Sequence, residues 1–177
     1  MRPHFSRHFR ALKETCLPRL VTKSCFFMGF FSLALPATAA TPDLPSRPVL
    51  TLAVAQQVLA AAQKQAENLH TPGVIAVVDD AGEVIIQVRM DNAYMRASTT
   101  LAPEKARSAV MFRRPTAALE SAIAGTRPAL MTARGFVMMK GGEPIFINNQ
   151  LVGGIGVSVD TPDHDEQIAQ AGLSVLK

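Results

Sequence analysis

Four basic side chains lie close together in the middle of the chain, at Lys105, Arg107, Arg113 and Arg114. In a helix, Lys105, Arg107 and Arg114 do not share one face with Val110. Some of these cations are therefore expected to point toward an anionic ligand, which they would hold through charge-assisted hydrogen bonds. A solvated helix face is the alternative, and the residue types alone do not decide between the two.

Tyr94 is the only tyrosine of the chain and lies between Met90 and Met95, in a segment expected to be a loop. Methionine and tyrosine side chains beside a basic helix could line a pocket for a flat, anionic and largely apolar molecule. Methionines that fill the core are the alternative.

Beyond its first 24 residues the chain has two histidines, His70 and His164. His70 is expected at the end of a helix, where contact with the last carbonyls or ligation of a cofactor are both open. His164 lies between Asp163 and Glu166, a group that could bind a cation, although capping of a helix N-terminus explains the acids without a metal. Two unplaced histidines do not define a catalytic triad.

Common catalytic sequence signatures are absent from the chain. It contains no G-x-S-x-G, no G-x-x-x-x-G-K-[ST] and no H-E-x-x-H. The glycine-rich segment 153–156 lies inside a strand pattern and precedes no helix, so it is not a dinucleotide-binding loop. Close approach of a ligand or of a neighbouring helix to the strand backbone is the better explanation.

The elements that must position these residues follow from hydrophobic periodicity. Helices are predicted at residues 50–69, 98–112 and 116–125, and from Thr161 toward the C-terminus. Strands are predicted at residues 74–79, 83–90, 136–139, 144–147 and 151–159. This order implies one antiparallel sheet of five strands with helices packed on it.

Residues 1–39 have the features of a cleavable secretory signal peptide. Residues 1–24 carry six of the 18 Lys and Arg and one of the 14 Asp and Glu, and an apolar run follows at 25–35. Small residues at 37–39 then offer a cleavage signature. The apolar run is shorter than the roughly 20 residues that span a bilayer. We therefore expect a periplasmic or secreted protein; an uncleaved anchor is the alternative.

Loss of the signal peptide changes what the composition implies. The chain has a net charge of +4, of which the signal segment carries +5, so the remaining chain is nearly neutral at −1, which argues against nucleic-acid binding. Both cysteines, Cys16 and Cys25, would leave with it, so neither a disulfide framework nor a cysteine-ligated metal is expected in the mature chain. No stable membrane anchor is expected after cleavage. The remaining sequence divides into an extended lead-in at 40–49 and one domain at 50–177.

Six segments of this domain resemble the GlcG/HbpS-like family of haem-binding, haem-degrading proteins. They are VVDDAGEVIIQVRMDNA, the A-x-x-KA of 102–106, FRRPT, GGEPIF, LVGGIGVSV and DEQIAQAGL, in this order. The resemblance implies a profilin-like α/β (α+β) domain with a five-stranded antiparallel sheet flanked by helices. It also implies assembly into symmetric homo-oligomers and binding of haem, in some members with iron release or haem breakdown.

The resemblance suggests an exported protein that stores, carries or senses haem. The axial ligand differs among family members, so it is not transferred by position, and His70 and His164 are both candidates. Side chains expected near the haem propionates are Lys105, Arg107 and Arg113. Side chains expected against the macrocycle are Met90, Tyr94 and Met95. Some members carry acid-x-x-acid pairs for iron, and Asp163 with Glu166 has this form.

A second hypothesis uses the same basic residues for another class of ligand. The protein would be an enzyme or auxiliary subunit that acts on a small organic anion in a catabolic pathway. Haem degradation is an activity that the resemblance allows, and the sequence does not decide between catalysis and binding alone. An oligomer whose pocket has no ligand is the third alternative.

Overall fold

The computed structural model describes residues 43–176, so the predicted signal peptide at 1–39 lies outside the described residues. Residues 43–49 form neither helix nor strand. The elements that follow are α1 (Leu52–Asn68), β1 (Val74–Asp79), β2 (Val84–Arg89), α2 (Ser98–Phe112), α3 (Thr116–Ala124), η1 (Pro128–Thr132), β3 (Gly142–Ile147), β4 (Gln150–Ser158), α4 (Pro162–Leu173) and η2 (Ser174–Leu176). Within this range no helix has the length and apolar character needed to cross a membrane.

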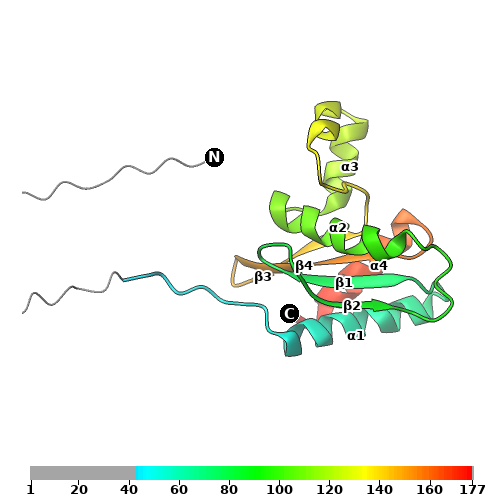
Figure 1. The fold of residues 1–177 in the computed structure, drawn as a ribbon, viewed down its shortest axis with the longest axis horizontal. Helices are drawn as coiled ribbons and strands as arrows, with labels where there is room; N and C mark the ends of the chain where they lie inside the picture. The colour runs from blue at the N-terminus through cyan, green and yellow to red at the C-terminus, as the bar shows by residue number, and fades with distance from the viewer. Residues whose placement is uncertain (1–42, 177) are drawn as a thin grey trace, which may run out of the picture. The chain divides into compact units, whose positions relative to one another are not determined.

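The strands form one four-stranded antiparallel sheet in the order β2-β1-β4-β3 (Figure 1). The predicted hairpin of β1 and β2 is confirmed, and Asp79 closes its turn by accepting hydrogen bonds from the N–H groups of Ala81 and Glu83, both at 2.9 Å. The β3–β4 hairpin turns at Asn148 and Asn149, both of which have positive φ, as a tight hairpin turn requires.

The fifth strand predicted at residues 136–139 is wrong, so the five-strand count is not confirmed. The N–H of Val137 donates instead to the hydroxyl of Ser108 on α2, at 2.9 Å. The N–H of Lys140 donates to the carboxylate of Glu120 on α3. Because side chains of two helices satisfy these backbone donors, the segment crosses the helices and does not join the sheet.

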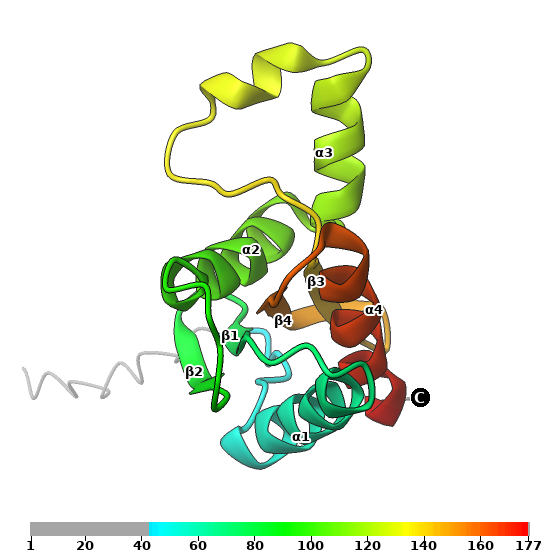
Figure 2. The ribbon, with the colours of Figure 1, turned by 90° about the vertical axis from the view of Figure 1, so that its right-hand side faces the viewer.

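The sheet is covered on both faces, which makes three layers (Figure 2). On β1, Ile75 and Val77 pack into the cluster formed with α1 and α4. The alternate residues Val74, Ala76 and Val78 pack against α2 on the other face. Burial of apolar side chains on both faces explains why β1 is a nearly continuous apolar run.

Glycines on β4 allow α2 to lie close to the sheet. A Cβ on Gly156 would stand 2.0 Å from the carbonyl oxygen of Ala102, and one on Gly154 would stand 3.0 Å from that of Ala106. Both positions face α2. The prediction that a neighbouring helix approaches the backbone of residues 153–156 is therefore confirmed.

A proline inside α2 creates a second contact with the sheet. Pro103 has no N–H, so the carbonyl of Thr99, four residues earlier, lacks its usual intrahelical donor. The side-chain amide of Gln87 on β2 donates to this carbonyl at 3.1 Å. The hydrogen bond ties the first turn of α2 to the edge strand.

After α2 the chain leaves the layers and forms a projecting lobe. The lobe consists of α3, η1 and the return segment to residue 139, and Figure 2 shows it standing away from the sheet. Arg113 ends α2 in the left-handed conformation, with φ 53°, which redirects the chain. The predicted start of α3 at Thr116 and its end at Gly125 are confirmed.

The contact between Gly156 and α2 gives a stability prediction. Gly156→Ala should lower the free energy of unfolding by about 3 kcal/mol or more, because the added methyl meets backbone that cannot move alone. Gly135→Ala is the matched control. Its Cβ would meet no described heavy atom within 4 Å, so only the cost of its positive φ, about 1 kcal/mol, is expected. Urea denaturation measures both values, and equal losses would contradict the close packing of α2.

Candidate functional site

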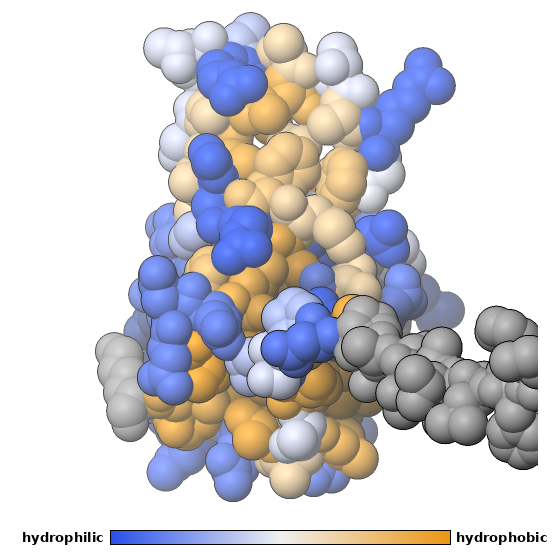
Figure 3. All heavy atoms as spheres, turned by 90° about the vertical axis from the view of Figure 1, so that its left-hand side faces the viewer, coloured by the Kyte–Doolittle hydropathy of each residue, from blue (hydrophilic) through white to orange (hydrophobic). Residues whose placement is uncertain are grey.

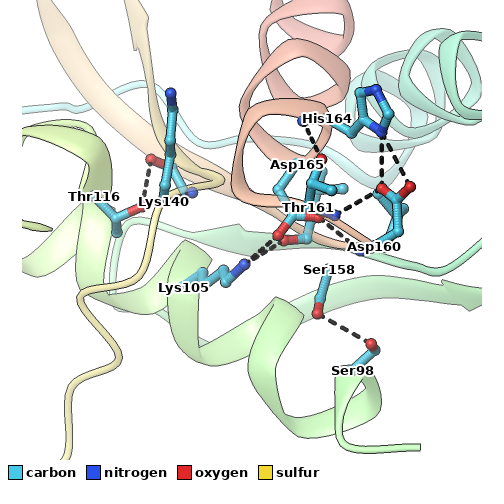
Figure 4. A network of polar contacts seen from close by, with 12 residues as sticks. Ser98, Lys105, Thr116, Lys140, Ser158, Asp160, Thr161, His164 and Asp165 are labelled. Atoms are coloured by element: carbon cyan, nitrogen blue, oxygen red, sulfur yellow. Dashed lines mark hydrogen bonds and ion pairs between the residues drawn. The ribbon is translucent and has the colours of Figure 1, made fainter. Parts of the chain in front are cut away.

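Lys105 lies in the interior and makes an ion pair with Asp165 (Figure 4). Its Nζ is 2.6 Å from Asp165 Oδ2 and donates to the carbonyl of Val157 at 3.1 Å. The other carboxylate oxygen of Asp165 accepts the N–H of Val159 at 2.6 Å. The pair therefore joins α2, the end of β4 and the first turn of α4.

This position removes Lys105 from the predicted anion-binding group. The residue is only 1% exposed, so its ammonium does not reach a surface where an anionic ligand could contact it. Burial raises the pKa of Asp165 above its ordinary value, and the nearby Lys105 ammonium opposes this shift. Sequence periodicity did not reveal the pair, because its two residues lie on helices that are far apart in the chain.

Arg107 and Arg113 do reach the surface, at the end of the sheet where β1 turns into β2. The guanidinium of Arg107 lies 3.7 Å from the carboxylate of Glu83. That of Arg113 lies 5.9 Å from the ring centroid of Phe146. Arg113 also lines a hollow of about 450 Å³ together with Arg47. Two guanidinium groups at one hollow suit an anion, although Asp80 in the same hollow pairs with Arg47.

His70 and Met90 lie together at the opposite end of β1. Both line a hollow of about 310 Å³, which Glu67, Thr71 and Asp91 also line. The backbone there is that of a helix ending: the N–H of Thr71 donates to Ala66, that of His70 donates to Glu67, and His70 has φ 57°. This is the hydrogen-bond pattern of a Schellman motif, in which Gly is the usual residue at the position of His70.

Two features of this hollow are unusual for ordinary packing. His70 adopts a left-handed conformation, which costs a residue with a side chain about 1 kcal/mol or more. Thr71 is 8% exposed, and its hydroxyl has no hydrogen-bond partner among residues 43–176. A buried polar atom without a partner loses its hydration without compensation.

Tyr94 and Met95 follow Met90 in the loop that leads to α2. The side chain of Tyr94 is 69% exposed and Met95 is half-buried. Neither residue lines the hollow at His70. The structure therefore unites His70 with Met90, and leaves these two predicted residues on the adjacent loop.

The acidic pair predicted to bind a metal holds a lysine instead. Lys140 Nζ lies 2.8 Å from Asp163 Oδ1 and 2.8 Å from Glu166 Oε2, and hydrogen bonding to Lys140 lowers the pKa of Asp163. Among residues 43–176 no group of three or more His, Cys, Asp or Glu side chains could hold a metal ion. The ammonium fills the place that the cation was expected to occupy.

His164 lies in the first turn of α4 and takes part in the hydrogen bonds that cap this helix. Its ring Nδ1 lies 2.9 Å from the carboxylate of Asp160. Its backbone N–H donates to the hydroxyl of Thr161, which is the N-cap of the helix (Figure 4). The predicted cap at Thr161 and the first-turn acids are confirmed. The capping explanation of this acidic cluster is thus the one that the structure supports.

Glu143 is a titratable residue that the sequence analysis missed. It is 6% exposed on β3. Burial raises its pKa to about 7, and the carboxylate of Glu166 adds to the shift. Its spacing of two residues from the core residue Ile145 could have indicated this burial, since residues two apart in a strand share a face of the sheet.

A hollow in the projecting lobe was also missed. It measures about 320 Å³, and its lining is mostly apolar, with three methionines: Glu120, Ile123, Leu130, Met131, Ala133, Phe136, Met138 and Met139. Phe136 packs edge-to-face on Phe112 with ring centroids 5.1 Å apart. The predicted strand at 136–139 would separate Met138 from Met139 on opposite faces, and no element is predicted at Met131.

The same arrangement of helices and sheet occurs in solved structures. A double mutant of HbpS from Streptomyces reticuli is 34% identical, with a TM-score of 0.72, and the match covers 81% of this chain and 98% of that one. A haem complex of PduOC is 28% identical, with a TM-score of 0.65, and the match covers 73% and 96% of the two chains. These similarities define a class of α+β domains, at least one of which has been crystallised with haem.

A family model described as haem degrading protein HbpS-like matches residues 50–174. The chain therefore belongs to the HbpS-like family. Protein GlcG of Escherichia coli strain K12 is 33% identical over 115 residues, which are 65% of this chain and 85% of that protein. The corrinoid adenosyltransferase PduO of Citrobacter freundii is 31% identical over 151 residues, 81% of this chain and 43% of that longer protein.

The buried ion pair predicts a large loss of stability when it is broken. Lys105→Met should lower the free energy of unfolding by about 3–5 kcal/mol, because the Asp165 carboxylate then stays buried without its cation. Adding Asp165→Asn removes that charge and should restore part of the loss. Lys140→Met, which breaks the more exposed ion pairs with Asp163 and Glu166, is the control and should cost much less, because water screens exposed charges. A Lys105→Met loss no larger than that of the control would show that the pair does not hold the helices.

Glu143 predicts a pH dependence of stability. The folded protein holds its proton up to about pH 7, while an unfolded glutamate releases it near its ordinary value of 4.5. Its contribution is fully present below that lower value and is lost as the pH rises through about 7, with a total of roughly 2–3 kcal/mol. Glu143→Gln should flatten the dependence of the free energy of unfolding on pH between about pH 4.5 and pH 7, whereas Glu83→Gln, on an exposed carboxylate, should not. Identical slopes in the wild type and Glu143→Gln would rule out this assignment.

Proposed function

We propose that the protein binds haem at the hollow between the end of α1 and the loop after β2, with His70 as the axial ligand. The observation that carries the proposal is that His70 and Met90, from separate elements, line one hollow. Imidazole nitrogen and thioether sulfur are both established axial ligands of haem iron. Membership of the HbpS-like family and similarity to the PduOC haem complex support the same ligand.

The residue types at the hollow are suited to binding haem. His70 is exposed, so its imidazole is accessible from solvent, and Met90 is half-buried beside it. The carboxylates of Glu67 and Asp91 at the same hollow disfavour the propionates there, so the propionates belong on the solvent side. Bound haem would supply an iron centre, and these residues would fix its ligation and surroundings.

The wider role extends this proposal. The basic and apolar N-terminal pattern supports export, so that the protein would handle haem in the periplasm or outside the cell. Storage, transport or sensing of haem, with or without iron release, fits a protein whose ligand lies near the surface. Assembly of several copies, as the family resemblance implies, is part of the same proposal.

A second candidate is the binding of a small organic anion at the other end of β1. The hollow lined by Arg47 and Arg113 favours it, because Asn149 and Gln150 add amide groups to the two guanidinium groups. A carboxylate of modest size matches this chemistry. This site and the hollow at His70 share no lining residue, so one chain could carry both.

Titration of haemin into the purified protein tests the first proposal. We expect a saturable shift of the Soret band, and His70→Ala should weaken binding by about tenfold or more and change the spectrum. Met90→Leu keeps the volume and should change only the spectrum if its sulfur ligates. His164→Ala, which removes an imidazole held by Asp160, and Arg113→Ala at the other end of β1 are controls and should bind as the wild type does. A spectrum unchanged in His70→Ala but altered in His164→Ala would refute the assignment.

A further inference from the structure

The projecting lobe contains a group of three methionines. Three of the eight methionines, Met131, Met138 and Met139, line a hollow of about 320 Å³ in the lobe. They come from η1 and from the return segment, so the fold of the lobe brings them together. Figure 3 shows apolar surface extending over the upper part of this face, where the lobe lies.

Core filling explains only one of these three side chains. Met131 is 75% exposed and Met139 is 49% exposed, whereas Met138 is 8% exposed. The two exposed side chains are held beside a hollow whose other walls include Ile123, Leu130 and Phe136. The two exposed thioethers present sulfur lone pairs that a ligand can reach from solvent.

The chemistry of the lining selects one kind of ligand. Glu120 is the only charged residue that lines the hollow in the described structure, and its carboxylate already accepts the N–H of Lys140. Hard cations such as Ca²⁺ and Mg²⁺ need several oxygen ligands, and structural zinc needs cysteine or histidine. Thioethers without such partners suit soft monovalent metals, of which Cu(I) is the biological example.

We propose that the lobe hollow binds Cu(I) through the thioether sulfurs of Met131, Met138 and Met139. The metal remains in its reduced state, and binding forms sulfur–copper bonds without any electron transfer. The two exposed methionines provide an entry route for the ion, while Met138 is the buried ligand. This site is separate from the hollow at His70, which shares none of its lining residues.

Competition with a coloured Cu(I) chelator tests the proposal under anaerobic conditions. The full chain is used with Cys16→Ser and Cys25→Ser in every sample, because thiolates would bind Cu(I) themselves. The protein should withdraw one Cu(I) per chain from bicinchoninate. The triple variant Met131→Leu, Met138→Leu, Met139→Leu should lose affinity by about tenfold or more. Met111→Leu, a methionine on α2 outside the hollow, should bind Cu(I) as the parent does.

Two further measurements keep the result interpretable. Met131→Leu with Met139→Leu changes only exposed side chains, so its loss of binding cannot be ascribed to misfolding through Met138. With Ag(I) as a redox-inert probe, the methyl resonances of these three methionines should shift in NMR spectra, and those of Met90, Met95 and Met111 should not. Copper that stays on the chelator, or equal binding by the triple variant, overturns the proposal. Haemin binding should persist in the triple variant and Cu(I) binding in His70→Ala, so failure of one site is distinguishable from failure of the other.

Discussion

The fold depends on how closely α2 lies against the sheet and on the ion pair that joins it there to α4. The glycines of β4 remove the side chains that would keep the helix away, and Lys105 then reaches across the end of the strand to Asp165. Taking two charges out of water carries a large desolvation cost, which the short contact and the bonds to Val157 and Val159 offset. The pair fixes the relative positions of elements that cover opposite faces of the sheet. It therefore specifies one arrangement of the layers in a way that apolar packing does not.

The parts of the fold that local chemistry determines could be predicted from the sequence. Thr51 and Thr161 each accept a hydrogen bond from the first turn of the helix that they cap, and each helix begins where these residues indicate. The hairpin turns at Gly82 and at Asn148 needed only local backbone preferences. Residues 136–139 could not be assigned in this way, because the groups that accept the N–H of Val137 and of the following Lys140, on Ser108 and Glu120, are distant in sequence.

At the candidate site, too, contacts between residues distant in sequence could not be predicted. Lys105 was predicted to contact an anionic ligand, because its partner Asp165 lies 60 residues away and no periodicity links the two. The distribution of the other predicted residues could not be predicted either: His70 and Met90 lie at one end of β1, and Arg113 lies at the other. The sequence gives the residue types, whereas the direction of each strand decides which of these residues lie close together. A pocket that appeared to be single thus separates into two hollows of different charge.

The left-handed backbone conformation of His70 has a consequence for engineering this protein. Its position after α1 is one at which glycine relieves strain, so replacement by glycine would gain backbone stability while deleting the imidazole. A screen that rewards thermal stability alone would favour that exchange. Directed evolution toward robustness would thus drift away from ligand binding at this hollow unless binding were selected at the same time.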